Sequence, residues 1–356
     1  MGICTTLLCH ASREAEDAPV NGQDPSMSRL QRFASVGACP TCRADLASSG
    51  SNGAHLVCTR CSATVRLQDG VVMALPSGHP AAGASTRPPE TQDGWAVGIA
   101  ADMDRKSDSY ALKYEHYTLA SRGYVIRRRH ALDMAGAAPG RVLEAGCGPG
   151  VVGPLLSERG LDVHGVDLSA GQLETAAARD DRTVYVQGDL ERLPYRSGAF
   201  DTVIMLGVLE YVERPEAVLA ELARVMTEGG RMVVSVPNAS GLPRLWTHYV
   251  YIPSARACKR ALGRPVSSYS RTLYSLRGFG ALLESVGLHL EQARFFDVCI
   301  APSPLDHLAA SSFLRRSDTL ESRLSGAARV ALSNQIIVSA GARGARDDHT
   351  YAAQGE

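Results

Sequence analysis

The sequence predicts an α/β protein in which helices wind a mostly parallel sheet, preceded by a small cysteine-bearing module. Three observations support this fold class. Apolar stretches alternate with amphipathic ones between residues 141 and 238, and strands separated by helices of about 10–15 residues indicate a parallel sheet with right-handed crossovers. A glycine-rich turn follows the first apolar stretch. Two C-x-x-C pairs precede the whole region.

Composition is that of an ordinary globular protein. The chain has 356 residues, of which 45% are hydrophobic and 21% charged, so it has room for one large domain and a small one. Lys+Arg and Asp+Glu are equal at 37 each, which excludes a global electrostatic attraction to nucleic acid or anionic membrane. We find no apolar run of membrane-spanning length and no convincing signal peptide. A cytoplasmic protein without a membrane span is therefore expected.

Composition also divides the chain into parts. The first residues are polar and irregular, and the stretch before residue 95 is rich in Pro, Gly, Ala and Ser, as linkers are. The expected parts are a disordered extension over 1–35, a zinc-ribbon module over 36–76, a linker over 77–94, a large α/β domain over 95–343 with variable stretches at 239–272 and 301–330, and a disordered tail over 344–356.

The module is defined by four cysteines. Cys39, Cys42, Cys58 and Cys61 form two C-x-x-C pairs separated by 15 residues, a spacing typical of structural zinc sites. Each pair sits on a tight turn that aims two thiolates at one point, and four thiolates close a tetrahedral site. The alternatives are a redox pair and four unrelated thiols. We favour structural Zn²⁺, because about 40 residues are too few to build a core alone.

The elements of the large domain follow in order along the chain. A helical pattern over about 95–138 comes first, and after it apolar and amphipathic periods alternate. The predicted elements are a strand at 141–147, a helix at 151–160, a strand at 162–168, a helix at 170–179, a strand at 183–190, a strand running into a loop at 200–212, a helix at 215–228, a strand at 230–238, an irregular stretch at 239–272, a helix at 275–286, a strand at 288–298, a variable stretch at 301–330 and a last strand at 334–340.

The turn "LEAGCGPGVVG" at 143–153 has two interpretations. Counted from Gly148 it reads G-x-G-x-x-G, the phosphate-binding turn of dinucleotide enzymes. Counted from Glu144 it reads E-x-G-x-G-x-G. Asp167, 19 residues after Gly148, suits a ribose in either case.

Two carboxylates favour the second interpretation. Glu144, just before the turn, would repel a pyrophosphate but suits a ligand with a cationic amino group and a sulfonium. Asp189 follows the third strand of the alternating region, where its carboxylate can accept a hydrogen bond from an adenine amino group. A cationic nucleoside ligand is therefore expected in place of NAD or FAD.

Together these motifs resemble the class I S-adenosylmethionine-dependent methyltransferases. The resemblance covers roughly 105–340 and rests on "VLEAGCGPG", "VHGVDLS", the stretch from "GDLERLPY" to "VVSVPN" and, less specifically, "YSLRGFGALLESVGL". It implies a Rossmann-like seven-stranded sheet whose last strand is antiparallel. It also implies S-adenosylmethionine as the cofactor.

The resemblance assigns roles to matching positions. The three glycines of the turn let the backbone pass under the cofactor, and the first carboxylate anchors its methionine end. Asp167 takes the ribose hydroxyls and Leu168 lies near the adenine. The implied cofactor residues are Glu144, Gly146, Gly148, Gly150, Asp167, Leu168, Asp189, Leu190 and Leu206, with Gly207 beside the last. Gly153, the third glycine of the dinucleotide pattern, is better interpreted as helix packing.

The sequence departs from the family at one point. Members often have Glu-His where this chain has Glu210-Tyr211, so a histidine base is lacking there. Methyl transfer is an in-line displacement on an activated carbon and needs a base only if the acceptor must lose a proton. The catalytic residues stay unknown, and the candidate bases are His116, Tyr117, Tyr211 and His248.

The cysteine segment resembles the small zinc-binding activator proteins of tRNA, rRNA and release-factor methyltransferases. The similarity lies in "CPTCRADL", "LVCTRC" and "DGVVMAL". It implies a docking or substrate-presenting role without catalysis of its own. A homodimer or a partner protein bound through this module is therefore a further expectation.

The acceptor is set by the variable stretches, and three hypotheses remain. A small molecule (a secondary metabolite, lipid or quinone, or glycan precursor), methylated on O or N, is favoured by their arrangement. An rRNA or tRNA base is the alternative, supported by the module and by Arg122, Arg127, Arg128 and Arg129; the neutral charge and three lysines oppose it. A non-catalytic regulator that binds the cofactor is the third.

Overall fold

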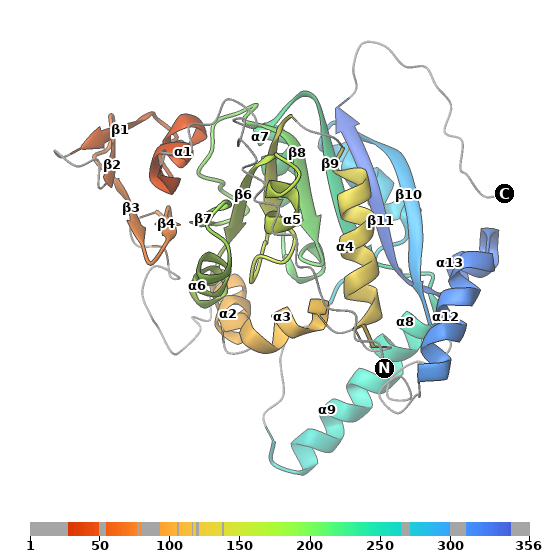
Figure 1. The fold of residues 1–356 in the computed structure, drawn as a ribbon. Helices are drawn as coiled ribbons and strands as arrows, with labels where there is room; N and C mark the ends of the chain where they lie inside the picture. Colours follow the sequence, from red (N-terminus) through yellow and green to blue (C-terminus); the bar gives the residue numbers. More distant parts are fainter. Residues whose placement is uncertain are drawn as a thin grey trace, which may run out of the picture.

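A computed structural model gives the fold (Figure 1). It describes residues 28–49, 55–76, 79, 93–104, 107–115, 117–118, 121–136, 139–264, 271–299 and 311–342. The expected tail over 344–356 and nearly all of the expected linker lie outside these residues.

Seven strands of the large domain form a mixed sheet in the order β7-β6-β5-β8-β9-β11-β10. The strands β5, β6, β7, β8 and β9 are parallel, whereas β11 is antiparallel to both of its neighbours. The predicted α/β fold with an antiparallel last strand is therefore confirmed. Their bounds are β5 Arg141–Ala145, β6 Asp162–Asp167, β7 Val184–Gln187, β8 Phe200–Leu206, β9 Met226–Pro237, β10 Leu288–Val298 and β11 Ser333–Ala342.

The predicted strand count of seven is wrong, because the sheet has eleven strands. The cysteine segment supplies the other four, and β4 pairs in parallel with β7, with Val71 opposite Tyr185. Without β4, the strand β7 would be an edge with open backbone donors and acceptors. The module is thus continuous with the large domain. The added strands are β1 Leu46–Ser49, β2 His55–Cys58, β3 Thr64–Gln68 and β4 Val71–Met73.

Helix α1, Arg29–Val36, corrects the expectation of disorder over 1–35 for its last residues. Ser28 begins the helix with a capping box: its hydroxyl accepts from the Gln31 amide, and the Gln31 side chain accepts from the Ser28 amide. Leu30, Phe33 and Val36 are buried on one face and join the same core as the module. Residues 1–27 lie outside the described part.

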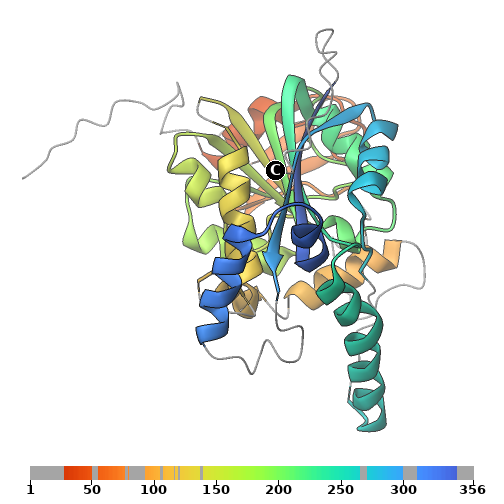
Figure 2. The same ribbon diagram turned by 90° about the vertical axis from the view of Figure 1, so that its right-hand side faces the viewer.

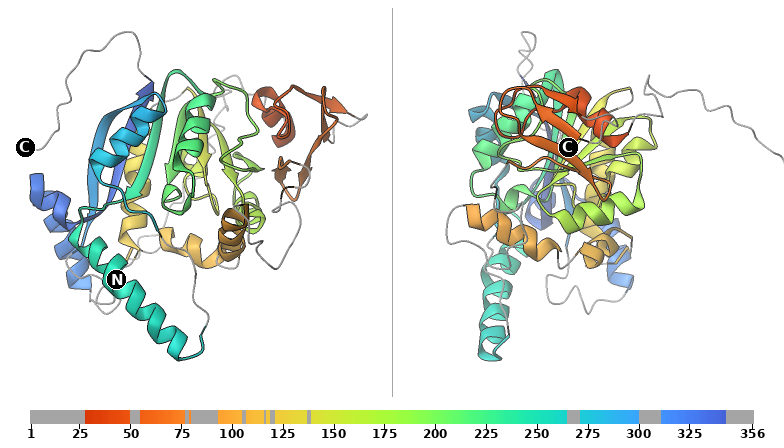
Figure 3. Two further views of the ribbon diagram at one scale, coloured as in Figure 1. Left: turned by 180° about the vertical axis from the view of Figure 1, so that it is seen from behind. Right: turned by 90° about the vertical axis from the view of Figure 1, so that its left-hand side faces the viewer.

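Helices cover both faces of the sheet (Figures 1 and 3). Successive residues of β8 show this: Ile204 belongs to a core cluster that includes residues of α4 and α5, whereas Val203 belongs to a cluster that includes residues of α1, α7 and α10. The helix α6 matches its predicted bounds. The bounds are α2 Asp93–Asp104, α3 Ser107–Glu115, α4 Arg122–Met134, α5 Gly153–Ser157, α6 Ala170–Arg179, α7 Pro215–Val225 and α10 Leu276–Ser285.

The stretch 239–272, expected to be irregular, is largely helical. Helix α8 (Leu242–Trp246), the π-helical turn η4 (Thr247–Tyr251) and α9 (Ile252–Ala261) follow one another without a break. Pro253 lies in the first turn of α9, where the widened turn before it accommodates a ring that lacks an N–H. We call residues 242–264 the arm. Figure 2 shows that it projects away from the body of the protein.

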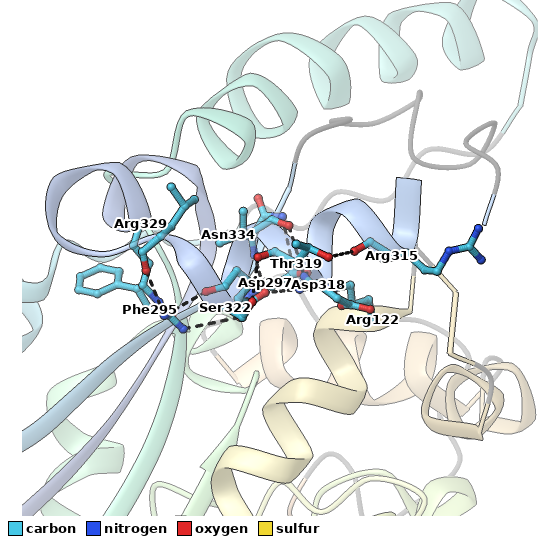
Figure 4. Close-up of polar contacts among 12 residues, drawn as sticks. Arg122, Phe295, Asp297, Arg315, Asp318, Thr319, Ser322, Arg329 and Asn334 are labelled. Carbon is cyan, nitrogen blue, oxygen red and sulfur yellow. Dashed lines mark hydrogen bonds and ion pairs between the residues drawn. The ribbon is translucent and has the colours of Figure 1, made fainter. Parts of the chain in front are cut away.

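Arg122, at the start of α4, fastens the C-terminal helices to the body (Figure 4). It is 1% exposed. Its guanidinium donates to Asp318 (2.6 Å) and Glu321 of α12 and lies 3.4 Å from Asp297 of β10. The variable stretch 301–330 is described only from residue 311, as α12 (Ser311–Arg323) and α13 (Gly326–Leu332).

Candidate functional site

A cavity lies at the carboxyl ends of the parallel strands, where open α/β sheets bind their ligands. Its walls come from the loops after β5, β6, β7 and β8 and from α2. The lining residues are His79, Ile99, Ala100, Met103, Gly146, Gly148, Asp167, Leu168, Gln172, Asp189, Leu190, Glu191, Leu206, Gly207, Val208, Tyr211, Val212, Glu213, Arg214 and Val218.

The glycine turn after β5 has the backbone that its sequence demands. Gly146, Gly148 and Gly150 have φ values of 71°, 53° and 68°, a region that residues with a Cβ rarely adopt. A Cβ on Gly146 would meet Val208 Cγ2 at 2.4 Å. The turn therefore lets the backbone itself form the cavity wall.

Asp167 ends β6 and lines the cavity. Its carboxylate accepts from the Gly148 amide (2.9 Å) and from the Ser169 amide (2.9 Å). Burial raises the pKa of Asp167, although these amides act against that rise. The carboxylate thus holds the glycine turn from the cavity side.

Glu144 lies behind the wall. It is 4% exposed, does not line the cavity and accepts from the Gly153 amide at 2.9 Å. Burial raises its pKa to about 8. Gly150 does not line the cavity either, and a Cβ added to it would meet the Tyr185 hydroxyl at 2.5 Å. Any contribution of Glu144 to binding therefore passes through the turn that it supports.

Asp189 faces the cavity after β7, beside Leu190. It accepts from the Glu191 amide (2.9 Å) and lies 3.5 Å from His79 Nε2. Burial alone would raise the pKa of Asp189, but these partners hold it below its ordinary value, so the carboxylate is ionised. Sequence reasoning missed His79, because a single histidine in a linker carries no pattern.

The residues at the end of β8 form a further wall of the cavity. Leu206 and Gly207 line the cavity, and the Gly207 amide donates to Ser235 Oγ at 3.0 Å. Tyr211 follows in the 3₁₀ turn η3, Leu209–Tyr211, with the Arg271 guanidinium 5.3 Å from its ring centre. Burial raises the pKa of Tyr211 to about 12. Its phenol is neutral at pH 7 and can donate a hydrogen bond.

The other base candidates lie elsewhere. The Tyr117 hydroxyl donates to Asp318 (2.7 Å), and burial raises its pKa to about 12. His248 belongs to the arm, where burial and neighbouring arginines lower its pKa. Neither lines the cavity described here. His116 lies outside the described residues.

Helix α2 closes the cavity on a side that the sequence did not predict. Ile99, Ala100 and Met103 supply an apolar wall. The Met103 carbonyl accepts from Gln172 at 2.9 Å, which ties α2 to α6. The apolar stretch "AVGIA" was the only available signal, and it did not say where the helix would dock.

The four module cysteines converge as their spacing predicts. One sulfur atom from each lies within 4.8 Å of all the others. The Sγ atoms of Cys39 and Cys61 are 3.5 Å apart, and those of Cys42 and Cys58 are 3.4 Å apart. Hydrogen bonds from the Cys61 and Arg60 amides lower the pKa of Cys58 to about 6. None of the four lines the cavity. Four thiols grouped in this way fit a tetrahedral, closed metal site.

No helix in the described part of the chain is long and apolar enough to cross a bilayer.

Comparison with known proteins agrees with this geometry. Residues 143–234 match a family described as a methyltransferase domain. A demethylmenaquinone methyltransferase of Renibacterium salmoninarum is 30% identical, over 50% of this chain and 81% of that protein. A ubiquinone biosynthesis O-methyltransferase of Pseudomonas aeruginosa is 32% identical, over 30% of this chain and 48% of its own length.

Among solved structures, one similar chain comes from a complex between the Haloferax volcanii Trm112 methyltransferase activator and a putative methyltransferase. It is 19% identical, with a TM-score of 0.47, over 68% of this chain and 98% of the other.

Proposed function

This chain belongs to the S-adenosylmethionine-dependent methyltransferases, and from that premise we propose that it methylates an oxygen or nitrogen of a small molecule. The observation that carries the proposal is one cavity that joins the glycine turn, Asp167 and Asp189. We propose as acceptor a secondary metabolite, a lipid or quinone, or a glycan precursor.

The cavity fits the cofactor by the chemistry of its walls. When bound, S-adenosylmethionine supplies an electrophilic methyl carbon on a sulfonium. We assign Asp167 to the ribose hydroxyls and ionised Asp189 to the adenine amino group. Leu168, Leu190 and the apolar side of α2 offer packing to the adenine ring. Gly146 and Gly148 offer backbone to the methionine end, held from behind by Glu144.

On the acceptor side, the residues of the chain orient the methyl acceptor and exclude water from the cavity. Tyr211, with a pKa of about 12, is a poor base but a good hydrogen-bond donor to an acceptor. An amine with a free lone pair, or a phenol that ionises near neutral pH, needs no enzyme base. Such acceptors match the replacement of histidine by Tyr211.

A small molecule is favoured over RNA by two observations. The relatives named above are called methyltransferases of demethylmenaquinone and of ubiquinone biosynthesis. Arg122 and Arg127, which supported the RNA alternative, are 1% and 5% exposed. Arg122 is engaged with carboxylates, and Arg127 donates to the Tyr114 hydroxyl. Buried arginines cannot contact a phosphate backbone.

We also propose that the cysteine cluster holds structural Zn²⁺. The module buries its strands in the same core as the large domain, so the metal would stabilise the sheet edge at β7. Strand β4 of the module is paired with β7 of the same chain, so that edge of the module is not open to a partner protein. A homodimer or a second protein at the remaining surface stays a prediction.

The proposed function is tested with radiolabelled S-adenosylmethionine and a panel of quinols, phenols and amines. The wild-type protein is expected to bind the cofactor and label at least one small acceptor. Asp167→Ala removes a charged hydrogen-bond acceptor and should weaken cofactor binding about 10–100-fold, measured by calorimetry. Methyl transfer to RNA alone, with no small acceptor labelled, would overturn the small-molecule proposal.

The zinc proposal predicts one metal ion per chain in the purified protein. Cys58→Ser should lower the zinc content well below this value and lower the Tm, because three thiolates no longer close the site. Elemental analysis and calorimetric melting measure both effects. Cys258→Ser is the matched control, since Cys258 is exposed on the arm. Equal zinc content and Tm in the two variants would refute the site.

A further inference from the structure

We infer that the arm, residues 242–264, binds the surface of an anionic lipid bilayer. This inference concerns a surface and is independent of the proposed acceptor. Three features carry it, namely exposed apolar side chains, a charge of one sign and the position of the arm relative to the cavity.

The arm exposes apolar side chains that a folded protein usually covers. Leu242, Trp246, Tyr249, Val250 and Leu262 are 61%, 46%, 66%, 43% and 66% exposed. In the described part of the chain only three other large hydrophobic residues are comparably exposed, namely Leu67, Leu112 and Tyr117. Helix α9 has no buried residue. Concentrated exposure of this kind marks an interaction site.

The charge of the arm has one sign. Between residues 229 and 283 the chain contains neither Asp nor Glu. The arm itself carries five cations, at Arg244, Arg256, Lys259, Arg260 and Arg264. Since the whole chain is neutral, this concentration is local. A helix that combines basic residues with exposed Trp, Tyr and Leu is typical of segments that lie in a membrane interface.

The arm leaves the protein at the sheet edge that holds the cavity. It follows the end of β9, next to the end of β8, where Leu206 lines the cavity. Figures 1 and 3 show that α2, which forms another wall of the cavity, lies at the same end of the sheet strands as the arm. An arm held on a bilayer would therefore bring the cavity close to the lipid surface.

A bilayer fits the arm better than a second copy or RNA. Two arms facing each other would bring cations together without a carboxylate between them, which is unfavourable. RNA would satisfy the cations but gives no benefit for exposing Leu242, Val250 and Leu262. An anionic bilayer attracts the basic residues and takes up the apolar ones.

The test is co-sedimentation of the full chain with vesicles. Wild-type protein should bind vesicles made of equal amounts of phosphatidylglycerol and phosphatidylcholine. It should bind vesicles of pure phosphatidylcholine much less. The triple variant Lys259→Ala, Arg260→Ala, Arg264→Ala should lose about fivefold per cation, or about 100-fold in all. Raising NaCl from about 0.1 M to about 1 M should also weaken binding, as the Debye length falls from ~10 Å to ~3 Å.

Two further variants separate the apolar contribution of the arm from its charge, and the charge of the arm from the charge of the rest of the surface. Tyr249→Ser with Val250→Ser keeps every charge and should still reduce vesicle binding about tenfold or more. Arg66→Ala, Arg182→Ala and Arg277→Ala remove the same charge from exposed positions outside the arm and should leave binding nearly unchanged. An unchanged Tm and unchanged cofactor binding in each variant show that it is folded.

Three outcomes would overturn the inference. These are no binding to anionic vesicles, binding that the arm variants do not reduce, and binding of total RNA or self-association that replaces vesicle binding and requires the arm. Because the readout is vesicle binding, methyl transfer is scored separately. A failure of the proposed function is therefore distinguishable from a failure of this inference.

Discussion

Replacement of Arg122 by alanine is expected to lower the free energy of unfolding by about 3–5 kcal/mol. Arg122 is 1% exposed, and its guanidinium meets the carboxylates of Asp297, Asp318 and Glu321. Burial alone would lower the pKa of Arg122, but the carboxylates, led by Glu321, raise it above its ordinary value. Without the arginine, buried Glu321 and partly buried Asp297 lose their nearest counter-charge, and Arg329, 4.0 Å from Glu321, is too distant to replace it fully.

Urea denaturation of the wild type and of Arg122→Ala measures this effect. The matched control is Arg179→Ala, whose partner Glu115 lies 3.6 Å away in a pair about half exposed on both sides. That pair should contribute about 0–1 kcal/mol. A loss of 1 kcal/mol or less for Arg122→Ala would mean that the three carboxylates relax into solvent or take up protons without it.

Gly146→Ala is expected to weaken cofactor binding by about 10–100-fold, because a displaced wall loses backbone contacts to a charged ligand worth about 1.5–3 kcal/mol. The residue has φ 71°, which costs about 1–2 kcal/mol for a residue with a Cβ. The new methyl group would also lie 2.4 Å from Val208 Cγ2. Since Val208 lines the cavity, relief of the clash moves the wall itself.

Calorimetric titration with S-adenosylmethionine measures the loss. Gly198→Ala is the control, since Gly198 has φ 66° but open space around an added Cβ. It should carry the same backbone strain and retain cofactor affinity. Equal affinities for wild type and Gly146→Ala would show that the turn does not form the binding wall.

Much of the site was predictable, because its residues lie at the carboxyl ends of the strands. In a parallel sheet the carboxyl ends of the strands meet at one edge, so Gly146, Asp167 and Asp189 were expected together. The cysteine cluster was predictable for the same local reason, since turn geometry fixes each thiol pair. All seven of these residues lie where the sequence suggested.

What failed depended on burial or on distant partners. Arg122 was counted among the arginines that support the alternative of an RNA acceptor, yet three carboxylates from β10 and α12 surround it. Glu144 was expected to anchor the methionine end of the cofactor; it is buried behind the turn and accepts from the Gly153 amide, and its role toward the cofactor stays a prediction. The arm was expected to be irregular, and it is largely helical although α9 buries no residue.

The sequence by itself determined the fold class, the family, the binding edge and the cysteine cluster. Each follows from short-range patterns, namely strand and helix periods, glycines that allow positive φ, and fixed cysteine spacing. Only the tertiary structure decided that β4 continues the sheet beyond β7, that Arg122 is enclosed by carboxylates and that the arm stands exposed. These outcomes depend on which distant surfaces pack against each other. Local periodicity carries no record of that choice.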